Sequence, residues 1–364
     1  MFKKYVLPVV LFALLLTSLQ ASDLEETLQS LSQDAGRSYV NPMVSAFGSD
    51  MNSGWFHKVP QAVISAWSFE VGIVAMCTLF IEDDKYFDVN GKFSFTRAQA
   101  EELAQDFADE SFFNDLVNQI MLQEFELGIT GPTVIGPSYD EADDDTAIQV
   151  HFDQQTITFT YEGETMQREL PAQSVKIPFG GLLDAYPAMP LAMPQLTIGT
   201  VYGTQASFRY LPEIVTVKEI GAVSYLGYGL QHNPAVWFTE PLPFDIALAY
   251  FAQKVEIGSI VEADAYNYGI NVAKTFGEKL IHVTPYLGFS IEKSKMHFRY
   301  DYQTGSTTNQ IPEVINIDFN VDGKNKNKFT TGLSLRLGLL NFNADVNFAK
   351  YPSASAGLAL NFSW

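Results

Sequence analysis

The stretch that decides the fold class is ASAGLALNFSW, residues 354–364, in which two kinds of side chain alternate. The residues at even positions are apolar and end in two aromatic residues, Phe362 and Trp364. The residues at odd positions are small or polar. In a β-strand, successive side chains point to opposite faces of the sheet. The stretch is therefore predicted to form a strand with one apolar face and one wet face.

The same alternation recurs upstream, in segments at 67–81, 266–272, 281–292, 329–339 and 342–348. In these segments, the positions between the apolar residues hold mainly Gly, Ser, Asn and Thr, with some charged residues. Transmembrane strands need roughly 9–11 residues and carry aromatic girdles near their ends, and most of these segments fit that description. The predicted fold is all-β: a transmembrane antiparallel β-barrel of about 10–14 strands with a small α+β insertion.

Two other structures are compatible with parts of this pattern. A soluble β-sandwich alternates in the same way, but segment length and the aromatic terminus favour the membrane barrel. Residues 62–81 are long enough for a transmembrane helix and carry a single charge, Glu70. Because the odd positions from Trp67 to Ile81 are all apolar, and a charge on a lone helix is costly in lipid, we predict a strand with Glu70 facing the lumen.

The first residues predict export. Lys3 and Lys4 precede an apolar run, and Ala21 is a small residue before a polar stretch, so residues 1–21 are predicted to be a cleavable signal peptide. Residues 22–60 are predicted to be an N-terminal lead, either a periplasmic helix or a lumen plug, and 61–364 the barrel. A short amphipathic helix is expected early in the lead and a break at 39–42. The predicted location is the outer membrane of a Gram-negative bacterium.

The charge balance excludes some partners. The chain has 42 acidic and 22 basic residues, which argues against nucleic acid, because nucleic-acid binding needs a basic face. It also argues against simple electrostatic docking on anionic lipid. Cys77 is the single cysteine, so no internal disulfide can form.

An insertion between barrel strands is predicted at about 96–175, built from a helix pair and a hairpin. Thr96 is a suitable N-cap with Gln99 at the N3 position. Five acidic residues lie within 140–145 and could bind Ca²⁺, although the spacing of an EF-hand is absent. A solvated, mobile acidic loop is the alternative interpretation.

Residues 178–194 contain four prolines, so no regular element is predicted there, and strands are expected to resume at Leu196. This segment is similar in kind to the lumen of the long-chain fatty acid transporter family, which implies an N-terminal plug and hydrophobic pockets inside the barrel. A packed plug or hinge is the alternative. The candidate lining of a solute path is Leu182, Leu183, Tyr186, Met189, Leu191 and Met193.

The C-terminal strand resembles the assembly signal of Gram-negative outer-membrane barrels. The resemblance implies recognition by the barrel-assembly machinery through Ala356, Leu358, Leu360, Phe362 and Trp364. The segments at 39–42 and 47–57 resemble the front of an uncharacterised outer-membrane barrel family of Bacteroidota-type bacteria, whose function is unknown. These resemblances imply location and fold but no chemistry.

No local signature of an enzyme is present: the five His residues are scattered, and no nucleophile elbow or phosphate loop occurs. We expect no enzyme activity, no cofactor and no metal. The leading hypothesis is a passive channel or uptake porin for a small solute, which can be hydrophobic, with outer-membrane lipid as surroundings. The alternatives are a structural or surface-interaction barrel, favoured if the lead fills the lumen, and a membrane-embedded hydrolase. The hydrolase would be favoured by a Ser or Asp close to a His at the outer rim.

Overall fold

The computed structural model describes residues 23–217, 221–278, 280–308 and 311–363. The chain divides into two compact units. Of the described residues, the first unit contains those up to Val40, in Asp83–Asp184 and in Asp301–Ile315, and the second contains those in Asn41–Glu82, in Ala185–Tyr300 and from Asn316 onward. The signal peptide predicted at residues 1–21 lies outside the described residues.

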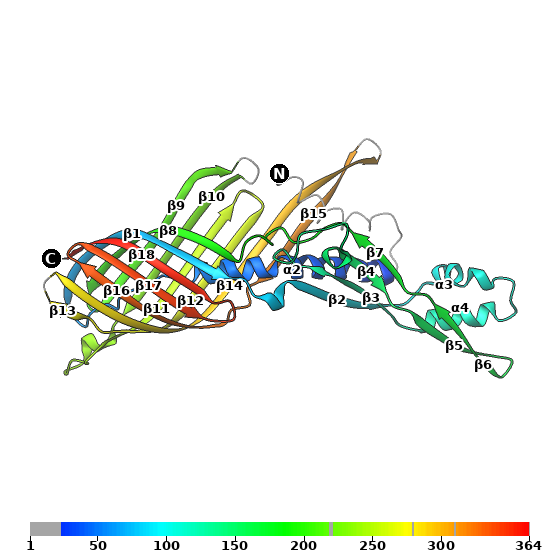
Figure 1. The fold of residues 1–364 in the computed structure, drawn as a ribbon, viewed down its shortest axis with the longest axis horizontal. Helices are drawn as coiled ribbons and strands as arrows, with labels where there is room; N and C mark the ends of the chain where they lie inside the picture. Colours follow the sequence, from blue (N-terminus) through cyan, green and yellow to red (C-terminus); the bar gives the residue numbers. More distant parts are fainter. Residues whose placement is uncertain (1–22, 218–220, 279, 309–310, 364) are drawn as a thin grey trace. The chain divides into compact units, whose positions relative to one another are not determined.

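The second unit is a closed antiparallel barrel of ten strands, which confirms the predicted fold class (Figure 1). Each strand pairs with the next around the barrel, and the last pairs with the first. In spatial order they are β1 (Ser65–Leu79), β8 (Ala188–Val201), β9 (Thr204–Val217), β10 (Gly221–His232), β11 (Asp245–Ile257), β12 (Val261–Ala273), β14 (Ile281–Thr308), β16 (Asn327–Leu337), β17 (Leu340–Phe348) and β18 (Ser353–Ser363). Two further strands, β13 (Phe276–Glu278) and β15 (Ile311–Asp322), pair with β14.

The alternation seen in the sequence sorts side chains between the two faces of the wall. On the outer face, Phe69 lies opposite Phe362 and Val71 opposite Leu360, and all four are more than a third exposed. On the inner face, Glu70 lies opposite Asn361 and is 3% exposed. The prediction of a strand rather than a helix around Glu70 is therefore confirmed. Among the described residues, no helix combines the length and hydropathy needed to cross a bilayer.

The first unit contains a four-stranded sheet and a helical module. The sheet has the order β2 (Tyr86–Phe93), β3 (Phe125–Pro132), β4 (Ile148–Phe152) and β7 (Gln173–Ile177). The module contains α3 (Arg97–Leu103), α4 (Phe113–Leu122) and the hairpin of β5 (Gln155–Tyr161) and β6 (Glu164–Leu170). Short 3₁₀ turns complete the elements: η1 (Glu82–Asp84), η2 (Gln105–Phe107), η3 (Asp144–Thr146) and η4 (Pro234–Trp237).

The helix pair and hairpin expected in the insertion are present, with Thr96 as the N-cap of α3. The insertion is wider than the predicted 96–175, because it runs from Asp83 to Asp184. The difference comes from β2 and β7, which frame the sheet. Residues of β2 alternate between exposed and more buried, but this strand lies before the predicted start at 96, and four of the five residues of β7 are exposed, so its sequence shows no apolar face.

The break predicted at 39–42 is wrong, because α2 (Asp23–Met51) continues through Pro42. A proline inside a helix removes one backbone hydrogen bond, but its fixed φ is compatible with the helix. Tertiary contacts hold the helix on each side of the proline. Before the proline, the Tyr39 hydroxyl donates to the Gly180 carbonyl at 3.1 Å, and after it, the Ser49 hydroxyl donates to the Tyr351 carbonyl at 3.2 Å.

The proline-rich segment also differs from expectation, because β8 begins at Ala188 and includes Pro190 and Pro194. Both prolines pair with β1, opposite Cys77 and Ile73. The ladder between β8 and β9 begins only at Gln195, so no carbonyl of β9 needs the N–H that these prolines lack. The regular strand therefore starts eight residues before the predicted Leu196.

Candidate functional site: the occupied lumen

Residues 41–60, called the lumen segment here, pass through the barrel from one end to the other. At one end the Asn41 amide bonds to Asp322, and the Ser49 hydroxyl donates to the Tyr351 carbonyl at 3.2 Å. At the opposite end the Asn233 amide donates to the Pro60 carbonyl at 2.8 Å. Residues 41–60 of the predicted lead therefore occupy the lumen, and the described residues before them, 23–40, belong to the first unit.

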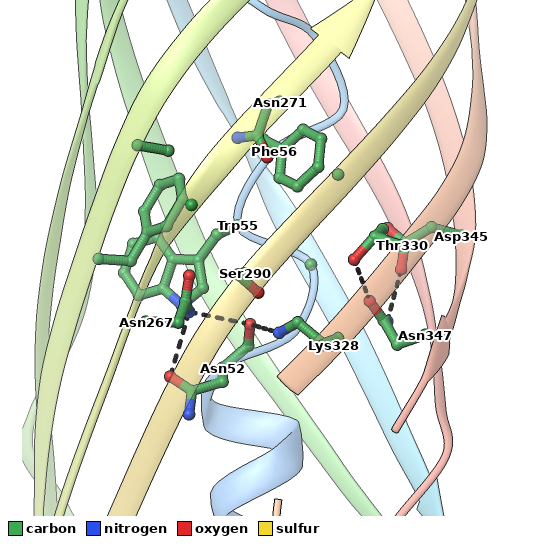
Figure 2. A pocket seen from close by; sticks show the side chains of 15 residues that line it. Asn52, Trp55, Phe56, Asn267, Asn271, Ser290, Lys328, Thr330, Asp345 and Asn347 are labelled. Carbon is green, nitrogen blue, oxygen red and sulfur yellow. Dashed lines mark hydrogen bonds between the residues drawn. The ribbon is translucent and has the colours of Figure 1, made fainter. Parts of the chain in front are cut away.

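Asn52 is the polar centre of the lumen segment, and Figure 2 shows side chains of the wall reaching it. The Gln253 amide donates to the Asn52 side-chain oxygen at 2.8 Å, and the Asn267 amide donates to the same oxygen at 3.1 Å. The Lys328 ammonium donates to the Asn52 carbonyl oxygen. Residues of β11, β12 and β16 therefore converge on one residue, so the segment is fastened to several sides of the barrel.

Trp55 fills the space beside Asn52. Its ring stacks on Phe251 with centroids 5.1 Å apart, and its indole N–H donates to the Met51 carbonyl at 2.9 Å. The Arg209 guanidinium lies over the indole, 4.1 Å from the ring centroid, and donates to the Ser53 carbonyl at 3.0 Å. A buried guanidinium is costly unless it is paired, and here a π face and hydrogen bonds compensate it.

Two glycines of the wall make room for the aromatic side chains of the lumen segment. A Cβ on Gly227 would lie 2.8 Å from the Trp55 ring, and a Cβ on Gly288 would lie 2.7 Å from the Phe56 ring. Any other residue at these positions would have to displace the ring. The wall and the lumen segment are thus complementary in shape as well as in hydrogen bonding.

Charged side chains connect the C-terminal part of the lumen segment to the wall. A Glu70 carboxylate oxygen lies 2.8 Å from the His57 ring, and the other accepts from the Lys58 ammonium at 2.9 Å. The Asn361 amide donates to Glu70 at 2.6 Å. The carboxylate predicted to face the lumen therefore binds the plug. A second pair lies within the wall, where the Lys328 ammonium is 3.0 Å from Glu292.

The cavity drawn in Figure 2 lies between the lumen segment and the wall, beside Trp55. Its volume is about 10 Å³, which is room for about one water molecule. Polar residues dominate its lining, including Asn52, Asn267, Asn271, Ser290 and Asp345. Around this cavity the lumen segment therefore packs closely against inward side chains of the wall.

A model of a protein family of unknown function, DUF6588, matches residues 2–362. The chain belongs to this family. No curated protein matches it.

Among solved structures, this DUF6588 member is similar to a loop-deletion mutant of OmpT, an outer membrane protein of Vibrio cholerae. The two chains are 10% identical, and the match covers 82% of this chain and 100% of that chain with a TM-score of 0.23. It is also similar to LpxR from Salmonella typhimurium, at 7% identity, covering 80% and 99%, with a TM-score of 0.25. The outer membrane protein opdK from Pseudomonas aeruginosa matches at 10% identity, covering 83% and 100%, with a TM-score of 0.20. The TM-scores are low, so no functional conclusion follows from these likenesses.

The six residues predicted to line a solute path are divided between the two units of the DUF6588 chain. Leu182 and Leu183 belong to the first unit, where their backbone N–H groups donate to the Val134 carbonyl. The others belong to the second unit, where Tyr186 is 61% exposed and Met193 is 5% exposed, with Met189 and Leu191 between them on β8. None of the six lines the cavity beside Trp55, so the solute path stays a prediction.

The other predicted sites are placed as follows. Ala356, Leu358, Leu360 and Phe362 lie on β18, and Trp364 lies outside the described residues. In the acidic loop, the Asp140 and Asp143 carboxylates accept hydrogen bonds from the backbone N–H groups of Ala142 and Asp145. Within the described ranges, no group of three or more His, Cys, Asp or Glu side chains is arranged to hold a metal ion.

One His–Asp pair meets the geometric condition set for a hydrolase. The His297 ring nitrogen lies 2.8 Å from Asp318, and Arg299 lies 3.6 Å from the same carboxylate. The Asp318 side chain is 49% exposed. Electrostatic catalysis is most effective where water is excluded, so the exposed pair is better explained as a surface ion pair. The expectation of no enzyme activity stays a prediction.

Proposed function

We propose that this protein is an outer-membrane barrel with a closed lumen, and that it anchors the acidic unit at the cell surface for interaction. The observation that carries the proposal is the lumen segment, which is fastened to the wall by hydrogen bonds, buried ions and fitted aromatic rings. It favours the surface-interaction barrel over the passive channel, because filling of the lumen is what distinguishes the two.

The outer face of the barrel supports the proposed location. Large apolar side chains are exposed on the outer face of strands around the barrel, including Ile73 at 61%, Leu230 at 53%, Phe289 at 53% and Leu333 at 52%. Monomeric soluble proteins rarely expose contiguous apolar surface of this kind, and in a barrel it matches a hydrocarbon belt.

The lengths of the connections support an orientation. At one end of the barrel, tight turns around Gly203 and Gly338 join β8–β9 and β16–β17, and the longest connection is the 12-residue segment 233–244 between β10 and β11. At the opposite end the chain leaves β1 for the long insertion and returns at β8. Bacterial barrels have short periplasmic turns and longer extracellular loops, so we propose that the insertion leaves from the extracellular end.

The charge of the insertion supports a role in interaction. Residues 83–184 contain 21 acidic and 5 basic residues, a net charge of −16 out of −20 for the whole chain. Such a field keeps a surface unit soluble and attracts cationic partners.

Conductance across a planar bilayer tests the closed lumen. The purified protein is expected to give no stepwise current, because residues 41–60 occupy the lumen. A variant that lacks residues 23–60 is expected to give steps, since the remaining wall is polar inside. A heat-modifiable gel band serves as the control for folding of both proteins. Steady current through the intact protein would refute the closed barrel and favour the porin.

Epitope tags test the orientation. A tag at Gly163, in the β5–β6 turn, is expected to bind antibody on intact cells, and a tag at Gly338, in the β16–β17 turn, only after permeabilisation. Both glycines have positive φ and open space around the Cβ position, so the two sites are matched. Labelling of Gly338 on intact cells would contradict the proposed orientation.

A further inference from the structure

The outer face of β14 changes character along the strand. Phe289 and Ile291 are apolar and exposed, and the next two outward positions are Lys293 and Lys295, which are also exposed. On the neighbouring strand β12, Tyr266 lies opposite Lys293 and Asp264 lies opposite Lys295. The two lysines therefore lie directly beyond the apolar belt, at the end of the barrel from which the insertion leaves.

The other charged groups on this face are mostly engaged with one another. Lys254 lies 3.1 Å from Glu256 and 2.8 Å from Glu262. His297 and Arg299 share Asp318.

Lys293 and Lys295 differ from these paired cations. Among the described residues, neither ammonium lies within 4.0 Å of a carboxylate, and Asp264 is the acidic group facing Lys295 across the ladder. In a chain with nearly twice as many acidic as basic residues, these two adjacent cations are a local reversal of the overall charge.

The opposite rim carries no equivalent feature among its described basic side chains. Lys274 is exposed, with its ammonium 5.4 Å from the centroid of the Phe276 ring, and the Arg336 guanidinium donates to the Gly338 carbonyl at 2.9 Å. The unpaired lysines thus lie at one rim, on the side proposed to be extracellular.

We propose that Lys293 and Lys295, with the Tyr266 hydroxyl, bind the phosphate of a phosphorylated glycolipid in the outer leaflet. Ammonium groups bind phosphate by charge-assisted hydrogen bonds, which are stronger than neutral ones. The adjoining Phe289 and Ile291 place the acyl chains of the same lipid on the belt. The assignment to a glycolipid and not a glycerophospholipid rests on the proposed function, because it needs the insertion end to face outward.

The test uses the full-length protein, purified in detergent and titrated with bisphosphorylated lipid A, dephosphorylated lipid A and phosphatidylglycerol, with native mass spectrometry as the readout. Bisphosphorylated lipid A is expected to bind most tightly. The double variant Lys293→Gln/Lys295→Gln is expected to weaken that binding about 10–30-fold, since two charge contacts to phosphate are lost. Lys274→Gln at the opposite rim is the matched control and should bind like the original protein. A heat-modifiable gel band verifies that each variant is folded.

Several outcomes would overturn the assignment. Equal binding of dephosphorylated lipid A would show that the site does not recognise phosphate. Equal binding of phosphatidylglycerol would show that it has no preference for a glycolipid. If the double variant bound bisphosphorylated lipid A as tightly as the original protein, or if Lys274→Gln lost as much affinity, the two lysines would not form the site. The binding assay involves neither conductance nor sidedness in a membrane, so its failure is distinct from failure of the closed-lumen proposal.

Discussion

Replacing Lys328 by Met is expected to lower the free energy of unfolding of the barrel by about 3–5 kcal/mol. The Lys328 and Glu292 side chains are 4% and 1% exposed, and the ammonium also holds the Asn52 carbonyl of the lumen segment. Removing the cation leaves a carboxylate buried without its partner, and this costs more than the pair itself contributes. Urea unfolding in lipid vesicles, followed by tryptophan fluorescence, measures the change.

Two further variants separate the ion pair from general effects. The double variant Lys328→Met/Glu292→Leu should regain most of the loss, because no unpaired charge remains inside. Lys274→Met removes an exposed lysine at the opposite rim and should change stability by no more than about 0.5 kcal/mol. A loss below about 1 kcal/mol in Lys328→Met would mean that water reaches the pair, which contradicts a filled lumen.

Replacing Gly227 by Leu is expected to push the Trp55 ring out of its place and to destabilise the barrel by about 1–3 kcal/mol through overpacking. Even the first atom of the new side chain would lie 2.8 Å from the ring, well inside van der Waals contact. Trp55 is 2% exposed, so its displacement should make it accessible to a soluble quencher. Acrylamide quenching measures this when Trp67, Trp237 and Trp364 are replaced by Phe, so that Trp55 is the remaining fluorophore.

Gly36 provides the control for this experiment, because a Cβ at that position meets nothing within 4 Å. Gly36→Leu should leave the quenching of Trp55 unchanged. If Gly227→Leu also leaves it unchanged, the ring does not occupy the gap in β10, and the fit between the lumen segment and the wall is disproved.

The barrel strands could be predicted because their signal is local. Along β1 and β18, apolar side chains on the outer face alternate with inward ones, so the period of two can be seen directly in the sequence. The lumen position of Glu70 followed from the same parity. Interruptions are harder to predict: Pro42 and Pro194 favour breaks in the chain, yet α2 and β8 continue through them. A proline shows which hydrogen bond is missing, but only the neighbouring strand or packing partner shows whether that bond was needed.

The candidate site could not be predicted at the same depth. The sequence allowed residues 22–60 to be a plug or a periplasmic helix, and no residue in that stretch distinguishes the two. The Met and Pro content of 178–194 favours a solute path in that segment. The contacts that fill the lumen instead come from Asn52, Trp55 and Phe56, polar or aromatic residues without any local motif.

Alternation of side chains by itself determined that this chain forms long two-faced strands, since the two faces of a barrel wall meet different solvents. The number of strands and the occupied lumen were decided only by tertiary structure. Asn52 and Asn267 are 215 residues apart in the sequence. The missing side chain of Gly227 matters only because the Trp55 ring occupies the space beside it. Such contacts depend on the closure of the barrel around the lumen segment, and they cannot be predicted from any periodicity along the chain.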